Sequence, residues 1–253
     1  MVKGLEIFKN HFKGFEKSYV LIGGTASSIV MEAAGINFRA TKDLDIVLCI
    51  ESLDPTFARK FWDFIEEGSY TNRQRSTGRK IFYRFHSPKN ANYPSMLELF
   101  SRVPDSLEIY HNKSTLTPIP IGENISSLSA ILLEPDYYNF IHKNKIIISE
   151  LSVIGPEILI PLKARAWLDL TERKNNGEKI DSRDIRKHKN DIFRLFLLLP
   201  RNFSIECPQL VKKDLSLFTE KIVTDSGLNL KALGIKTLSL NEILARLKII
   251  YTI

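Results

Sequence analysis

Cysteine is scarce in this sequence, since only Cys49 and Cys207 occur among its 253 residues. Two cysteines provide neither a disulfide framework nor the paired spacing of a zinc site, which excludes small disulfide-stabilised domains and zinc modules. Cys49 follows the apolar residues 46–48, so we expect it to be a small core residue. This cysteine usage is typical of a protein in a reducing cytoplasm.

Long hydrophobic runs are also missing. No stretch of about 18 apolar residues is present, so the sequence predicts no membrane span and no membrane partner. Residues 1–6 lack the apolar segment of a secretory signal. We therefore expect a cytoplasmic protein.

Acidic residues are in the minority: 36 Lys and Arg stand against 29 Asp and Glu, which gives a net charge of +7. A basic surface raises the local concentration of polyanions such as RNA, DNA or nucleotides. A soluble protein with no polyanionic partner can have the same composition, so charge alone leaves both interpretations open. The hydrophobic fraction of 43% is ordinary for a globular chain and does not favour disorder.

The hydrophobic pattern predicts a mixed α/β front half and a mainly helical back half. Short apolar runs predict strands at residues 19–22, 45–50, 80–86, 96–100, 116–121, 130–133 and 146–153. Helical spacing predicts helices at residues 5–15, 25–34, 57–67, 156–174, 182–199, 207–222 and 240–249, with Ser182 as an N-cap. The strands at residues 80–86 and 96–100 are expected to form a hairpin-like pair. A domain boundary is expected between residues 115 and 150.

An acidic pair is the sharpest feature of the front half. Asp43 and Asp45 lie at the mouth of the strand predicted at residues 45–50, and residues two apart in a strand point to the same side. Two carboxylates that converge repel each other unless a cation lies between them, and oxygen ligands favour Mg²⁺. Such triplets also occur at ordinary solvated strand ends, which is the alternative interpretation.

A glycine turn precedes this pair. Gly23, Gly24 and Thr25 stand between a predicted strand and a predicted helix. Glycines let a backbone approach a phosphate closely, and the start of a helix attracts anions. The alternative is a tight turn that needs a positive φ angle. The turn is not a Walker loop, because no Gly-Lys-Ser/Thr ends it.

A third carboxylate lies inside an apolar run. Glu98 is flanked by apolar residues on both sides, and a buried carboxylate is costly without a partner. A metal ion is one such partner, and the alternative is a strand with one charge facing solvent. A glycine turn, an acidic pair on the next strand and an acid on a later strand together form the layout of two-metal phosphoryl chemistry.

These residues carry a resemblance to a known family. Residues 23–26 and 39–45 resemble the signature of the AbiEii/AbiGii-type nucleotidyltransferase toxins, which is a Gly-Gly-Thr-Ala turn followed by Arg-x-Ser/Thr-x-Asp-Leu/Ile-Asp. All of these positions match, and the similarity spans residues 19–50 before it fades. The resemblance implies an α+β fold: a nucleotidyltransferase-like mixed β-sheet with flanking helices, followed by a mainly helical C-terminal part. The catalytic core would be residues 1–120, and residues 121–253 would complete the nucleotide site.

The resemblance also implies roles for individual residues. Asp43 and Asp45 would be metal ligands, with Glu98 as the third acid. The expected nucleotide-binding residues of the front half are Gly23, Gly24, Thr25, Arg39 and Thr41, where Arg39 steadies the loop or meets a phosphate and Thr41 caps or orients the acidic turn.

Two residues of the back half are similar to a lysine and an aspartate of the same family. Lys163 would hold nucleotide phosphate, and its alternative is a lysine whose stem packs while its head reaches water. Asp191 would complete the catalytic set, and its alternative is a salt bridge to Lys187 one turn back. A basic cluster around residues 183–189 either guides RNA or forms a charged, solvated helix face.

The sequence therefore predicts an enzyme that uses Mg²⁺ or Mn²⁺ and transfers a nucleoside monophosphate from an NTP to an acceptor. The family suggests a tRNA 3′ end, other RNA or a protein as acceptor, and a toxin role with a cognate antitoxin. A small-molecule nucleotidyltransferase of the antibiotic type is one alternative. A catalytically inactive nucleotide-binding module is another, and it gains if Glu98 lies far from the aspartate pair.

Overall fold

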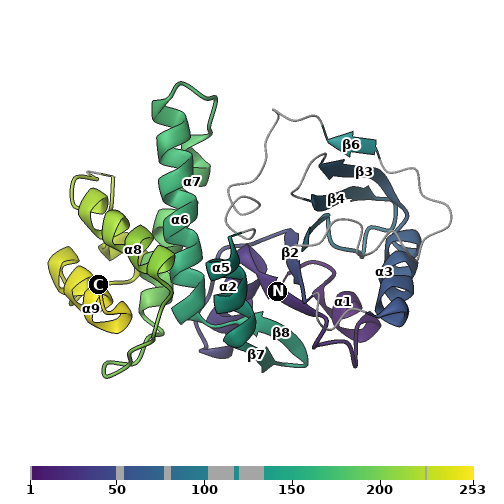
Figure 1. Cartoon of the computed structure of the whole chain (residues 1–253), viewed down its shortest axis with the longest axis horizontal. Helices are drawn as coiled ribbons and strands as arrows, with labels where there is room; N and C mark the ends of the chain where they lie inside the picture. The colour runs from purple at the N-terminus through teal and green to yellow at the C-terminus, as the bar shows by residue number, and fades with distance from the viewer. Residues whose placement is uncertain (1, 50–53, 77–80, 102–116, 120–133, 226) are drawn as a thin grey trace.

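The structure is a computed structural model that describes residues 2–49, 54–76, 81–101, 117–119, 134–225 and 227–253. A sheet with its helices occupies one side of the molecule, and a helical C-terminal part occupies the other (Figure 1). The predicted mixed sheet, flanking helices and helical C-terminal part are thereby confirmed.

The front part of the chain alternates between helices and strands. Its elements in chain order are α1 Leu5–His11, β1 Tyr19–Ile22, α2 Gly23–Ala33, β2 Asp43–Leu48, α3 Pro55–Glu67, β3 Tyr70–Ser76, β4 Ile81–Pro88, β5 Met96–Ser101 and β6 Thr117–Ile119. The remaining elements are α5 Pro135–Lys143, β7 Lys145–Ile148, β8 Leu151–Ile154, α6 Pro156–Asn175, α7 Ser182–Phe196, α8 Gln209–Ile222, the 3₁₀ helix η3 Lys231–Leu233 and α9 Leu240–Tyr251.

The strands form one mixed sheet in the order β6-β3-β4-β5-β2-β1-β8-β7. β2 is central, because it pairs antiparallel with β1 and parallel with β5. β4 and β5 pair antiparallel, which confirms the predicted hairpin-like unit. β7 and β8 join this sheet through the parallel pairing of β1 with β8, so the sheet draws on chain beyond residue 120. The expected boundary at 120 and the strand expected at 130–133 lie outside the described residues.

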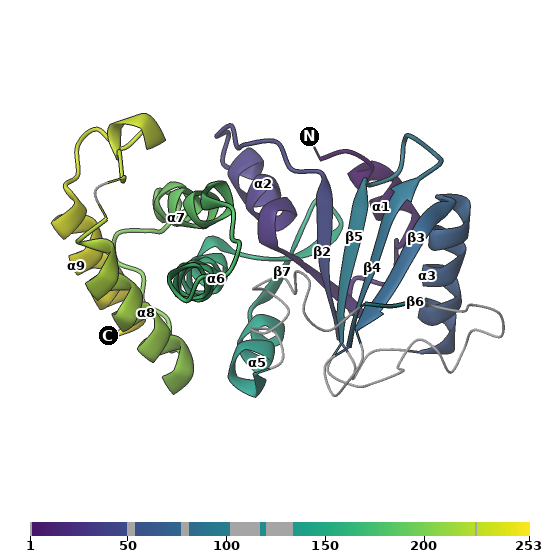
Figure 2. The same cartoon turned by 90° about the horizontal axis from the view of Figure 1, so that it is seen from above.

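One face of the sheet is covered by α1 and α3 through an aromatic cluster (Figure 2). Phe12 contacts Phe57, and Phe61 packs edge-on against Phe85 of β4 with ring centroids 5.8 Å apart. Helix α3 starts where it does because the Asp54 carboxylate accepts a hydrogen bond from the Phe57 N–H at 2.7 Å.

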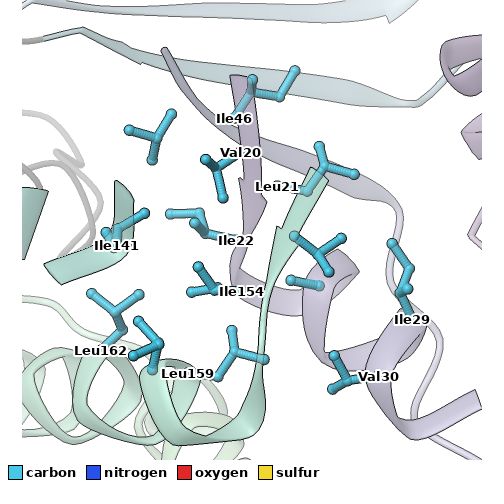
Figure 3. Packing of buried hydrophobic residues seen from close by; sticks show 14 of the residues in the cluster. Val20, Leu21, Ile22, Ile29, Val30, Ile46, Ile141, Ile154, Leu159 and Leu162 are labelled. Atoms are coloured by element: carbon cyan, nitrogen blue, oxygen red, sulfur yellow. The ribbon is translucent and has the colours of Figure 1, made fainter. Parts of the chain in front are cut away.

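The other face packs against α2, α5 and α6 around β1 and β8 (Figure 3). Ile22 and Ile154 lie between the sheet and α6, where Leu159 and Leu162 meet them. All four side chains are at most 2% exposed. This core fixes α6 against the end of β1, which is where the glycine turn begins.

Several expected elements differ from the observed ones. The single strand expected at 146–153 is two strands, because Ser149 and Glu150 take positive φ angles and reverse the chain. Asp181, and not Ser182, caps α7, since its carboxylate accepts the Arg183 N–H at 2.8 Å. β3 and α5 were not predicted. Among the described helices, none combines the length and the apolar character that crossing a bilayer requires.

Candidate active site

Strand β2 presents the two predicted aspartates on one side of the sheet. Asp43 and Asp45 are its first and third residues, and Asp45 is only 9% exposed. The hydroxyl of Thr25 donates a hydrogen bond to the Asp43 carbonyl oxygen at 2.6 Å and so fastens α2 to the start of β2. Thr25 itself is fully buried and does not line the pocket described below. Its observed contact is therefore to the backbone of the acidic strand.

The glycine turn wraps closely around Asp45. Gly23 has φ +62°, and a Cβ at this position would overlap the Asp45 carboxylate. The backbone N–H of Gly24 donates a hydrogen bond to that carboxylate. A Cβ on Gly24 would lie 2.8 Å from the Thr41 hydroxyl. Gly23 is thus favoured by contact with the acidic strand and by its backbone angle, and Gly24 by contact with Thr41 in the loop before that strand.

Burial and acidic neighbours raise the pKa values of both aspartates. Burial raises the pKa of Asp43, and the nearby Glu98 raises it further. The pKa of Asp45 is raised well above its ordinary value, first by burial, then by Glu98 and by Asp43. The nearby cations, Lys187 for Asp43 and Lys163 for Asp45, lower these pKa values by less than burial and the acidic neighbours raise them.

Glu98 lies beside the pair, but its carboxylate has another partner. It stands directly opposite Asp45 in the parallel β2–β5 register, and it is 4% exposed. Arg84, its cross-strand neighbour on β4, donates from Nε to Glu98 Oε1 at 2.7 Å. Within the described residues, no group of three or more His, Cys, Asp or Glu side chains is placed to hold a metal ion. The structure thus brings Glu98 to the predicted place without completing a three-acid cluster.

The helices contribute the opposite charge. Lys163 of α6 is 3% exposed, and its Nζ donates to Asp191 Oδ2 at 2.8 Å. Arg39, from the loop before β2, binds the same carboxylate at 2.8 Å through Nη2 and at 3.2 Å through Nε. The alternative of a lysine with a solvated head is therefore wrong. The salt bridge from Asp191 to Lys187 is also wrong, because Lys187 binds Asp184 at 2.8 Å.

The pKa of Asp191 is shifted in the opposite direction to the pKa values of Asp43 and Asp45. It is fully buried, and burial by itself raises the pKa of its carboxyl group. Lys163 and Arg39 overcome that effect, so the pKa of Asp191 falls below its ordinary value. Asp191 is a charged anchor that holds both cations in place.

A pocket of about 160 Å³ lies between these two groups. Its charged walls hold three carboxylates and three cations, and its apolar floor is Leu159 and Leu162 of the core in Figure 3. The residues that line it are Gly23, Gly24, Arg39, Thr41, Asp43, Asp45, Leu159, Leu162, Lys163, Asp184, Lys187 and His188. Six predicted site residues of the front half and Lys163 thus share one pocket, while Thr25, Glu98 and Asp191 lie outside its lining.

His188 was missed as a site residue by the sequence analysis. Its Nδ1 atom is buried and makes no hydrogen bond to any described residue. Burial, together with Lys163 and Arg39, lowers the pKa of His188 to about 3, so the ring is neutral. The sequence did offer a signal for the burial of His188. His188 stands four residues before Ile192, a buried residue of α7, and that spacing places both on one side of the helix.

The basic cluster of α7 is not a continuous basic face. Arg183 binds Asp181, Lys187 binds Asp184, and Lys189 is buried against Asp225 at 2.7 Å. Each of these three cations has an acidic neighbour, so the cluster alone does not indicate an RNA-binding helix.

Two of the solved structures that are similar to this chain are the following. A nucleotidyltransferase-like antigenic protein from Paracoccidioides brasiliensis is 13% identical, with a TM-score of 0.42 and 93% of each chain covered. The Megavirus polyadenylate synthase is 10% identical, with a TM-score of 0.38; the match covers 87% of this chain and 37% of that one. No family model and no curated protein matches the sequence. At these TM-scores, the function is inferred from the geometry of the site itself.

Proposed function

We propose that this chain is a divalent-metal-dependent nucleotidyltransferase, which transfers a nucleoside monophosphate from an NTP to an acceptor. One observation carries the proposal: a single pocket holds two aspartates whose pKa values are raised, together with the cations Arg39, Lys163 and Lys187. A metal-bound polyphosphate matches both groups, because the metal would bind the carboxylates and the phosphates would bind the cations.

The aspartate pair fits a hard divalent cation. Burial and repulsion raise the pKa of both carboxyl groups, which is the condition that a bound cation relieves. Asp43 and Asp45 would hold Mg²⁺ or Mn²⁺, with Glu98 within reach on the next strand. When bound, the metal supplies charge neutralisation at the phosphates.

The cations of the pocket would hold the triphosphate. Lys163 is fixed by Asp191 and cannot swing into solvent, so it offers a positioned ammonium group. Arg39 and Lys187 line the same pocket from the loop and from α7. A volume of about 160 Å³ suits phosphates and metal rather than a whole nucleotide, so the base would lie outside it.

In this reaction an acceptor hydroxyl attacks the α-phosphorus in line. The new P–O bond forms as the bond to pyrophosphate breaks, and pyrophosphate leaves with the electron pair while the hydroxyl proton goes to solvent. The residues of this chain orient the phosphates and exclude water from them.

The acceptor and the biological role rest on the signature at residues 23–26 and 39–45. That resemblance suggests a tRNA 3′ end or a protein as acceptor, with a role as the toxin partner of a cognate antitoxin. The net charge of +7 supports a polyanionic acceptor such as RNA.

The test is a transfer assay with each of the four α-labelled NTPs, Mg²⁺ and, in separate reactions, total RNA, cell protein and an aminoglycoside. We expect label in RNA or protein with the wild type, and a rate lower by about 10³-fold or more with Asp45→Asn, because several kcal/mol of charge stabilisation are lost. Asp63→Asn, the same change at an exposed residue of α3, is the matched control and keeps the rate.

Other outcomes discriminate between the alternatives. Label on the aminoglycoside alone would favour the small-molecule enzyme. No label with any NTP and any acceptor, from a folded protein with added Mg²⁺, would contradict the proposal and favour the inactive binding module.

A further inference from the structure

Three charged side chains form a row across neighbouring strands. The β2–β5 register places Asp45 opposite Glu98, and the β4–β5 register places Glu98 opposite Arg84. All three therefore point to the same face of the sheet. Directly opposed residues in a sheet are near enough for their charges to interact strongly.

Arg84 uses only one side of the Glu98 carboxylate. Its Nε and Nη2 atoms both contact Oε1, and the two side chains are 17% and 6% exposed. No hydrogen bond within the described part of the chain uses Oε2. Glu98 thus has one oxygen bound by a guanidinium. It is also the cross-strand neighbour of Asp45, whose pKa is raised by burial and by acidic neighbours.

We propose that Arg84 competes with the divalent cation for Glu98, and so sets how tightly the site binds metal. Arg84 is a positioning residue: its guanidinium binds the Glu98 carboxylate, and its main effect on the metal would pass through that carboxylate. The inference rests on the proposed function, since it concerns the metal that Asp43 and Asp45 would hold.

The physical reason is that one carboxylate serves two cations. Engaged by Arg84, Glu98 contributes little negative charge to the Asp45 side of the row. When a metal binds at Asp45, Glu98 must share or give up its contact with the guanidinium, and the loss of that contact weakens metal binding. Without Arg84, the full charge of Glu98 is available to the metal.

The experiment measures Mn²⁺ binding to the full chain by electron paramagnetic resonance of the free ion, with no nucleotide present. We expect Arg84→Gln to bind Mn²⁺ about tenfold more tightly than the wild type, the size of one charge-assisted hydrogen bond. Glu98→Gln should bind it more weakly. The double variant should lose the gain of Arg84→Gln, because the arginine acts through that carboxylate.

Arg165→Gln is the matched control. Arg165 of α6 binds the buried carboxylate of Asp214 of α8 at 3.1 Å, outside the lining of the pocket. The substitution therefore removes the same charge from another pair of an arginine and a buried carboxylate. We expect its Mn²⁺ affinity to equal that of the wild type. Equal tightening in Arg165→Gln and Arg84→Gln would overturn the proposal, because net charge alone would then account for the effect.

The remaining outcomes are also decisive. If Arg84→Gln does not fold, Arg84→Lys keeps the charge with one contact fewer, and tightening of a few-fold is expected. Unchanged or weaker Mn²⁺ binding in the Arg84 variant, or a double variant that keeps the gain, overturns this inference alone. Absence of Mn²⁺ binding in the wild type, or binding indifferent to Asp45→Asn, overturns both this inference and the metal-dependent function.

Discussion

The pocket has two charged walls, one from the sheet and one from the helices, and their carboxylates have opposite surroundings. On the sheet wall, Asp43 and Asp45 lie next to each other and to Glu98, and the pKa of each aspartate is raised by burial and by its acidic neighbours. On the helix wall, the fully buried Asp191 has Lys163 and Arg39 as partners, and its pKa is lowered.

This difference separates a residue that holds the structure from residues that await a ligand. The buried charge of Asp191 is compensated within the chain, so its removal should unfold the site. Burial and repulsion outweigh the nearby cations at the aspartate pair, so removal of these charges should relieve repulsion and leave the fold intact. The same residue type therefore has opposite effects on stability at the two walls.

The largest expected effect is at Asp191. Asp191→Ala leaves Lys163 buried without its partner, and we expect the free energy of unfolding to fall by about 3–5 kcal/mol. Urea unfolding followed by circular dichroism measures it. Asp184→Ala, on the same helix, breaks an exposed pair with Lys187 and should cost less than about 1 kcal/mol. Equal losses in the two variants would remove the distinction between the walls.

An intermediate effect is expected at the glycine turn. Gly23 and Gly177 both have positive φ angles, but a Cβ on Gly177 meets nothing within 4 Å, whereas one on Gly23 overlaps the Asp45 carboxylate. Gly177→Ala should therefore cost about 1–2 kcal/mol for the backbone angle alone. Gly23→Ala should cost clearly more in the same unfolding measurement. Similar costs would mean that the turn does not press on the acidic strand.

The smallest expected effect is a gain in stability for Asp45→Asn without divalent metal. Because the folded pKa of Asp45 is raised, the folded state binds more protons than the unfolded state above about pH 4, and the stability of the wild type falls as pH rises through that window. Asp45→Asn lacks this loss, so its advantage should be absent below pH 4 and increase as the pH rises to 8. Thermal unfolding from pH 4 to 8 in a chelating buffer measures it, and a destabilised variant at pH 8 would contradict it.

The sheet wall of the pocket was largely predictable from the sequence, because the patterns that place its residues are local. The alternation of a strand placed Asp43 and Asp45 on one face, and the position of the glycines between a strand and a helix placed the turn. These residues are close in the chain, so spacing and secondary structure decide their geometry.

The other contacts depend on pairings between distant segments. Arg39 and Asp191 are 152 positions apart, and their bond follows from the packing of α7 against the loop before β2. The partner of Glu98 required the β4–β5 register, which the sequence does not specify to the residue. Helix α5 was missed because its Tyr and Phe residues, although buried, are weak helix formers.

The bond that joins the loop to α7 has a practical consequence for measurements at different salt concentrations. Asp191 is fully buried and the ammonium group of Lys163 is beside it, so mobile ions reach this junction poorly. Exposed ion pairs on the surface are, by contrast, screened within a Debye length of about 8 Å at physiological ionic strength. Raising the ionic strength should therefore weaken the exposed ion pairs of the surface while the buried pair in the interior keeps its geometry, so that the two kinds of ion pair are separable in one titration.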